Sequence, residues 1–243
     1  MLAQREYSRE RAVEYARRWA LDRNPLYYDY TGIGGNCTNF VSQCVYAGCC
    51  TMNYTPVYGW YYLSPAERTA SWTGVRYFYD FITGNENVGP FAREVGANEV
   101  EPGDVVQLAR QETGYYHSLL VVGRQGEDIL VAAQSDDALD RPLSTYDYDY
   151  ARFLHVEGVR IRVPDTEDCF ASLLAGEAIL PDLASSPPLP SDPAEMQESE
   201  APSPAEPTPT EPTPAPTEPT PTEPAPAPTE PAPTPTEPPA DGT

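Results

Sequence analysis

The sequence predicts an α+β domain followed by a tail that has no core of its own. Apolar residues recur at helical spacing through residues 8–47 and alternate as in strands after residue 104, which is the order of helices packed on an antiparallel sheet. Proline marks the boundary, because 22 of the 29 prolines lie in residues 181–243, which contain no arginine. We therefore expect one domain over residues 1–180 and a disordered, acidic, Pro/Thr/Glu-rich tail over residues 181–243.

The net charge of −22 limits the classes of partner. Residues 1–180 alone hold 15 arginines against 25 acidic residues, a charge of −10. Such a domain repels phosphate backbones and anionic lipids, so we expect no nucleic-acid partner and no membrane anchor. The first 24 residues lack the apolar core of a secretory signal, and no stretch reaches the ~20 apolar residues of a membrane span. We expect a cytoplasmic protein, and export by an unrecognised route stays open.

Two helices are expected before residue 50. The first begins at Ser8, which can cap it, and ends at Asn24-Pro25, because the residue before a proline avoids helical backbone. Its buried face is formed by Ala12, Val13, Ala16, Trp19 and Ala20. The second is expected over residues 37–47, with Gly48 as its end and with a buried stripe of Phe40, Val41, Cys44 and Val45.

The later elements follow from changes in periodicity. A third helix is expected over residues 75–82, and the many aromatic residues between positions 54 and 81 are expected to pack in the core rather than to bind substrate. After a turn at residues 101–104, alternation predicts strands at 105–108, 116–122, 128–133 and 152–163, and then a closing helix over 168–180.

Cys37 is the strongest candidate for chemistry. A cysteine in the first turn of a helix lies at the positive end of the helix dipole, which favours its thiolate, and Asn36 before it is a suitable N-cap. The alternative is a small core residue, which is what unpaired cysteines commonly are. The five cysteines show neither a disulfide framework nor the regular spacing of a zinc site, so we expect reduced thiols, no metal and no cofactor.

Only two histidines compete for the role of base. His117 opens an apolar strand and can project from the rim of the sheet toward a helix terminus, whereas His155 lies within a strand and is expected to be structural. Gln134 ends the strand at residues 128–133. Its amide could accept the imidazole N–H that catalysis does not use and so fix the tautomer.

The run Gly-Gly-Asn-Cys-Thr-Asn-Phe-Val-Ser-Gln-Cys at residues 34–44 resembles the signature of the bacterial putative amidase domain family, a papain-like group related to the NlpC/P60 hydrolases. The similarity continues at residues 71–72, 102–107, 117–118 and 141–144 and spans about residues 5–163. It implies a papain-like fold with Cys37 as nucleophile, His117 as general base and Gln134 as the residue that orients the base.

The sequence departs from this family at two positions. Asn36 stands where the family usually has aspartate, which keeps a cap but removes a charge. Gln134 stands where the family commonly has histidine, and Asp136 is the alternative residue to orient His117.

These features predict a cysteine-dependent hydrolase that cleaves amide bonds in peptides or in peptidoglycan-type cell-wall peptides. Two alternatives stay open. One is a catalytically weak or inactive papain-like module that binds partners through the acidic Pro-rich tail, and the other is a thiol acyltransferase. The presence of both Cys37 and His117 favours an enzyme, and Gln134 in place of the usual residue favours a binding module weakly.

Overall fold

The computed structural model describes residues 1–163 and 168–177. The predicted tail over 181–243 and the end of the predicted closing helix lie outside these residues. The described helices are α1 (Arg9–Trp19), α2 (Cys37–Cys49), α3 (Ala70–Thr73), α4 (Val75–Gly84), the 3₁₀ turn η1 (Leu143–Thr145) and α5 (Phe170–Ala175). The described strands are β1 (Leu2–Arg5), β2 (Gly89–Val95), β3 (Val105–Arg110), β4 (Gly114–Gln125), β5 (Asp128–Ala133), β6 (Ala138–Pro142) and β7 (Tyr150–Arg162).

The strands form one sheet in the order β1-β7-β3-β4-β5-β6, and β2 also pairs with β7. Every pairing between described strands is antiparallel. The long strand β7 joins the two ends of the sheet, because its first half pairs with β3 and its second half with β1 and β2. The predicted α+β class with helices on an antiparallel sheet is confirmed, and the papain-like topology stays a prediction.

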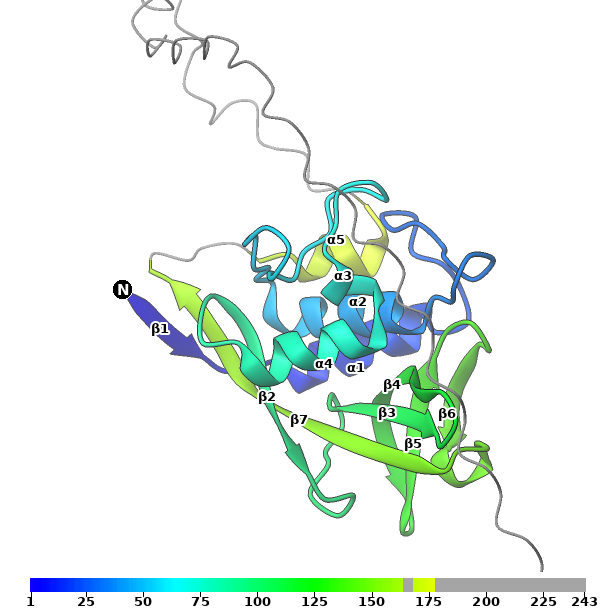
Figure 1. Cartoon of the computed structure of the whole chain (residues 1–243). Helices are drawn as coiled ribbons and strands as arrows, with labels where there is room; N and C mark the ends of the chain where they lie inside the picture. Colours follow the sequence, from blue (N-terminus) through cyan, green and yellow to red (C-terminus); the bar gives the residue numbers. More distant parts are fainter. Residues whose placement is uncertain (164–167, 178–243) are drawn as a thin grey trace, which may run out of the picture. The chain divides into compact units, whose positions relative to one another are not determined.

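The sheet separates two apolar cores. On one face, Leu120, Val122 and Ala132 pack with the buried residues of α1, α2 and α4, and in Figure 1 these helices lie together on one side of the strands. On the other face, alternate residues such as Leu119 and Val131 form a second cluster among β3 to β6. Side chains of a strand alternate between faces, so this division tells which residues of β4 point toward α2.

Helix α1 begins where the sequence predicts and ends earlier. The Ser8 hydroxyl accepts the backbone N–H of Arg11 at 3.4 Å, so the cap is confirmed. The helix stops at Trp19 rather than at Asn24, which is buried and donates its amide to the Leu173 carbonyl at 2.9 Å. Asn24 thus holds α5 against the end of α1 instead of ending a helix.

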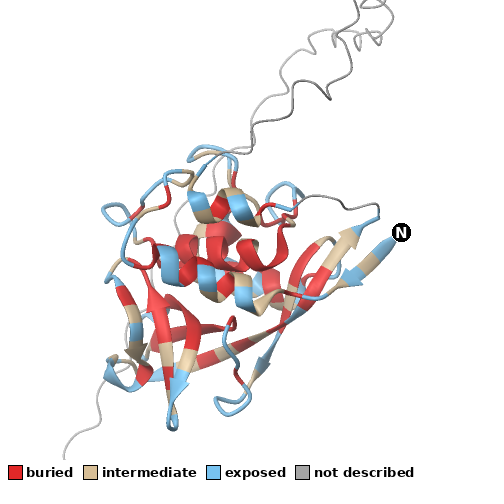
Figure 2. Cartoon of the chain, turned by 180° about the vertical axis from the view of Figure 1, so that it is seen from behind, coloured by how far each residue is buried: buried red, intermediate tan, exposed pale blue. Residues whose placement is uncertain are grey.

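Helix α2 is buried along nearly its whole length, as Figure 2 shows. Gly48 does not end it, and the left-handed residue after the helix is Cys50, with φ 46°. A Cβ on Gly48 would collide with the Tyr7 ring and with the Ser8 carbonyl, so this glycine serves close packing. The prediction of the helix end was therefore wrong by two residues.

Cys50 and Cys169 form a disulfide bond, which corrects the expectation that all the cysteines are reduced. The bond ties α5 to the end of α2 across 119 residues of sequence. Cross-links of this kind persist in oxidising compartments. Within the described part of the chain, no helix is long and apolar enough to cross a membrane.

Candidate active site

The start of α2 is fixed by Asn36, although not in the way predicted. Its side chain makes no capping hydrogen bond to the helix. Its Oδ1 atom instead accepts two other hydrogen bonds, from the backbone N–H of Tyr30 at 3.0 Å and from the side-chain Nδ2 atom of Asn39 at 2.9 Å. Its Nδ2 atom donates to Gln134 Oε1 at 2.5 Å, and its backbone N–H donates to Ser135 Oγ at 2.6 Å. Asn36 therefore fastens the helix start to the end of β5.

Cys37 is the first residue of α2 and is 7% exposed. Its Sγ atom lies 3.8 Å from the Thr38 hydroxyl. No described residue accepts the backbone N–H of Cys37, as expected of the first amides of a helix. The thiol and this N–H thus share one helix terminus. Of the other thiols, Cys44 lies in the core, where burial raises its pKa well above the ordinary value.

A row of polar side chains crosses the helix-facing side of the sheet beneath this terminus. Gln107 on β3 is paired in register with Ser118 on β4 and with Arg152 on β7. Leu120 on β4 pairs with Ala132 on β5 in antiparallel register. Gln134, two residues after Ala132, therefore lies opposite Ser118, two residues before Leu120. We call Arg152, Gln107, Ser118 and Gln134 the polar row. Two of its members contact α2, because Ser118 Oγ lies 3.0 Å from Thr38 Oγ1 and Gln134 bonds Asn36.

His117 precedes Ser118 but shares the strand face of Leu119 and Val121, which belong to the second core. Its ring lies 6.1 Å from the rings of Tyr116 and Tyr146. Among the described residues, it makes no hydrogen bond, to Cys37 or to any other. Burial lowers the pKa of His117 from 6.5 to about 4, the Asp136 charge opposes this shift and the Arg141 charge adds to it.

Gln134 does not make the hydrogen bond to His117 that the sequence suggested. Its Oε1 atom accepts from Asn36, and its Nε2 atom donates to the carbonyls of Trp19 at 2.7 Å and Asp22 at 2.8 Å. The Gln134 amide thereby joins the end of α1 to the start of α2. Asp136, the alternative residue to orient His117, makes no hydrogen bond to a described residue. Its negative charge raises the pKa of His117 against the effect of burial.

His155 belongs to a separate cluster. Its Nδ1 atom lies 2.9 Å from Asp104 Oδ2, and Asp104 is fully buried and also bonds Arg9 at 2.5 Å. The Asp104 carboxylate further accepts the backbone N–H groups of Glu101 and Val156. These contacts fit the structural role expected of His155.

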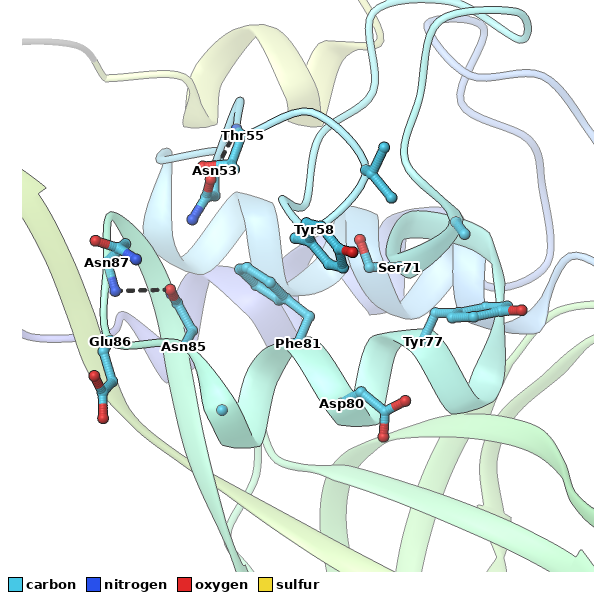
Figure 3. A pocket seen from close by; sticks show the side chains of 13 residues that line it. Asn53, Thr55, Tyr58, Ser71, Tyr77, Asp80, Phe81, Asn85, Glu86 and Asn87 are labelled. Atoms are coloured by element: carbon cyan, nitrogen blue, oxygen red, sulfur yellow. Dashed lines mark hydrogen bonds between the residues drawn. The ribbon is translucent and has the colours of Figure 1, made fainter.

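An open cavity of about 520 Å³ lies elsewhere, between the loop at residues 53–58 and helix α4 (Figure 3). Tyr58, Ser71, Tyr77 and Phe81 line it, and Asp80 and Glu86 add two carboxylates. None of the predicted site residues lines this cavity. The aromatic residues between 54 and 81 are thus divided, with Trp60, Trp72 and Phe81 buried and Tyr58 and Tyr77 exposed.

Sequence reasoning missed Gln107, Ser118 and Arg152. A signal was present for two of them, because each is a polar residue within or beside an apolar run: Gln107 follows Val105-Val106, and Ser118 precedes Leu119-Leu120. A buried polar residue requires a hydrogen-bond partner, and residues of this type on adjacent strands can supply one another.

An α+β fold that carries a cysteine at a buried helix start over a row of polar strand residues defines a class of candidate thiol enzymes. The comparison with protein families then gives the family. The model of the putative amidase domain matches residues 6–156, so the chain belongs to that family. Its description points to amide hydrolysis in general terms.

The chain also resembles a bacterial protein along part of its length. It is 34% identical over 137 residues to "Uncharacterized protein YhbB" of Bacillus subtilis (strain 168). The match covers 55% of this chain and 43% of the relative, so the chain spans less than half of that protein. No solved structure matches the chain.

Proposed function

We propose that the chain is a cysteine-dependent amide hydrolase that acts on peptide or peptidoglycan-type amides, with Cys37 as nucleophile and His117 as general base. The observation that carries the proposal is the position of Cys37. Cys37 begins α2, and hydrogen bonds hold the residues on both sides of it: Asn36 bonds Gln134, and Thr38 bonds Ser118. The backbone N–H of Cys37 has no acceptor among the described residues. Family membership supports the same class of reaction.

The first chemical step forms a thioester. His117 takes the proton of the Cys37 thiol, and the sulfur attacks the amide carbonyl carbon. The backbone N–H of Cys37 donates a hydrogen bond to the developing oxyanion. The C–N bond then breaks as His117 returns the proton to the leaving amine, and water hydrolyses the thioester to release the acid.

This mechanism requires the imidazole to turn toward α2 across the rim of the sheet. The His117 ring makes no hydrogen bond to a described residue that would hold it in its present position. Catalytic hydrogen bonds are often long before substrate binds. A pKa of about 4 keeps this imidazole neutral at pH 7, so it is able to accept a proton. The same pKa makes the imidazole a weak base, which favours slow chemistry.

The second candidate is a binding module without catalysis. The observation that favours it is His117 itself, whose ring faces Tyr116 and Tyr146 and lacks an orienting partner among the described residues. In that case Cys37 would be a well-packed core residue, and peptide binding would proceed without turnover.

The test combines thiol labelling with turnover. Wild type, Cys37→Ala and the matched control Cys44→Ala are treated with iodoacetamide at pH 7 and mapped by peptide mass. Separate, unlabelled samples of the three proteins are assayed for amine release from peptide amides and cell-wall peptides. We expect labelling first at Cys37 and loss of turnover only in Cys37→Ala. Labelling of Cys49 before Cys37, or equal turnover in all three proteins, would exclude the hydrolase.

A further inference from the structure

Four buried side chains form an unbroken line of hydrogen bonds from β7 to the start of α2. Arg152 donates to Gln107 Oε1 through Nε at 2.8 Å and Nη2 at 2.5 Å. Gln107 Nε2 lies 3.1 Å from Ser118 Oγ, and Ser118 Oγ lies 3.0 Å from Thr38 Oγ1. The exposed fractions are 8% for Arg152 and 0% for the other three, so water does not replace these bonds.

The direction of the Gln107 amide is set by its neighbours. Arg152 carries only donors, so the atom of Gln107 that faces it must be the carbonyl oxygen. The Val75 carbonyl, 2.9 Å from Gln107 Nε2, accepts only, so the amino group must face that side. Gln107 therefore donates its second N–H to Ser118, and a flipped amide would break the contacts with Arg152 and with Val75.

This direction continues to Thr38. Ser118 Oγ receives the Gln107 proton, and the acceptor available among the described residues for its own proton is Thr38 Oγ1. If Thr38 donated to Ser118 instead, the buried Ser118 hydroxyl proton would have no acceptor, which is costly. Ser118 therefore donates to Thr38, and the Thr38 proton is left for Cys37 Sγ, 3.8 Å away.

We propose that Arg152, Gln107, Ser118 and Thr38 form a one-way donor chain that delivers a hydrogen bond to the sulfur of Cys37 and favours its thiolate. The proposal rests on the proposed role of Cys37 as nucleophile. Thr38 touches the reacting sulfur, and the other three are positioning residues. The Arg152 guanidinium packs between the rings of Tyr79 and Tyr115, at 3.4 Å and 3.8 Å, and it forms no ion pair with a described carboxylate. The Glu94 and Asp80 charges act on the guanidinium at longer range, and the hydrogen bonds of its Nε and Nη2 atoms go to Gln107.

The test measures the ionisation of Cys37 without any substrate. The alkylation rate of Cys37 is followed by peptide mapping from pH 5 to pH 10 in wild type, Thr38→Val and Thr38→Ser. Valine keeps the shape of threonine and removes the hydroxyl, and serine keeps the hydroxyl. We expect Thr38→Val to slow alkylation about tenfold at pH 7, an effect of about 1.4 kcal/mol, and to leave the rate at pH 10 unchanged. Thr38→Ser should stay within about twofold of wild type.

Two further variants distinguish the effect of the donor chain on Cys37 from the effect of removing a buried polar group. Ser42→Ala also removes a buried hydroxyl from α2, one that bonds the Trp72 carbonyl and Trp60, and it should leave the inflection of the rate profile unchanged. Gln107→Glu keeps the bonds to Arg152, loses the N–H that the Val75 carbonyl accepts, and turns the donor that faces Ser118 into an acceptor. Ser118 then donates to the new carboxylate and accepts from Thr38, so Cys37 alkylation at pH 7 should fall about three- to tenfold while every hydroxyl remains.

Other charges near this terminus are the same in all variants: His117 on β4, Asp136 and Asp137 after β5, and Arg23 and Asp29 in the loop before α2. A shift of the inflection in Thr38→Val and Gln107→Glu, with rescue by serine, supports the chain. An unchanged inflection in Thr38→Val, or an equal shift in Ser42→Ala, overturns it. If the inflection shifts but wild type cleaves no amide, the proposed function fails and the donor chain stands.

Discussion

The two histidines of the chain stand on strands of the same sheet in opposite surroundings. His155 is held by Asp104 and Arg9, and Asp104 itself has four partners. His117 has two aromatic rings beside it and no hydrogen bond to a described residue. The difference separates a histidine whose contacts are used by the fold from one whose ring nitrogens make no hydrogen bond to a described residue.

The Asp104 cluster and the polar row also differ in the number of charged side chains that they contain. The cluster of Asp104, Arg9 and His155 joins the start of α1 to β3 and β7, and a buried carboxylate with an ion pair and backbone donors is stable there. The polar row under α2 uses amides and hydroxyls instead, with Arg152 as its one charged group. The start of α2 is thus held by hydrogen bonds between uncharged groups, from Thr38 to Ser118 and from Asn36 to Gln134.

The largest expected effect concerns catalysis at the two histidines. His117→Gln should lower kcat/KM for an amide substrate by about 10²- to 10⁴-fold, because a general base is lost. We expect His155→Gln to stay within about threefold when rates are normalised to folded protein, since its contacts are structural. Steady-state kinetics with circular dichroism on both variants measures this. Equal losses in the two would mean that neither histidine is distinguished by its surroundings.

The next effect concerns stability at the other cluster. Asp104→Asn should reduce the free energy of unfolding by about 3 kcal/mol, because Arg9 loses its buried counter-charge and His155 loses the carboxylate beside its Nδ1 atom. The matched control is Asp147→Asn, whose carboxylate pairs with Arg110 on the surface and is 89% exposed, and we expect no measurable change. Urea denaturation measures both. A loss in Asp104→Asn as small as that of the control would show that the cluster is solvated.

Much of this arrangement could be predicted from sequence. Periodicity predicted the start of α1 after Ser8, the start of α2 at Cys37 and the span of β5, because each coincides with a cap or a change of period. The strands β1, β2 and β6 were missed. Each is partly exposed, and their pairing with β7 or β5 depends on contacts that propensity alone does not specify.

The candidate site was predicted less completely than the fold. Cys37 could be proposed from sequence because helix-start chemistry is local, and its role stays a prediction. The partners of Gln134 could not be proposed, since the carbonyls of Trp19 and Asp22 become its acceptors only when α1 ends at Trp19 rather than at Asn24. The disulfide was missed for a similar reason, because Cys50 and Cys169 meet only through the docking of α5.

A smaller effect is expected in the pH dependence of stability. The pKa of His117 is about 4 in the folded protein against 6.5 as the ordinary value, so the unfolded chain binds more protons between these values. Stability therefore falls as pH falls through this window, by about 2 kcal/mol between pH 7 and pH 5 from this group alone. His117→Gln should remove that part of the slope. An unchanged slope in chemical denaturation at the two pH values would show that the folded protein protonates His117 freely.

The smallest effect tests whether the two departures from the family pattern are one coupled change. Asn36 and Gln134, the two positions at which we expect the sequence to depart from the family, bond each other at 2.5 Å. Asn36→Asp alone places a carboxylate against Gln134 Oε1, and the Gln134 amide cannot flip without losing the carbonyls of Trp19 and Asp22. We expect a loss of about 1–2 kcal/mol in the free energy of unfolding.

Adding Gln134→His to Asn36→Asp supplies a ring N–H for the carboxylate, so the double variant should be more stable than the sum of the single changes predicts. Contacting residues show coupling energies of about 0.5–3 kcal/mol, and we expect about 1 kcal/mol because only one hydrogen bond is exchanged. A double-mutant cycle by urea denaturation at pH 7 measures it. Additive changes would mean that the two departures arose independently. A second measurement compares the effect of His117→Gln on turnover in wild type and in the double variant. Coupling in stability, together with the same effect of His117→Gln in both backgrounds, would show that position 134 acts on the start of α2 and not on the base.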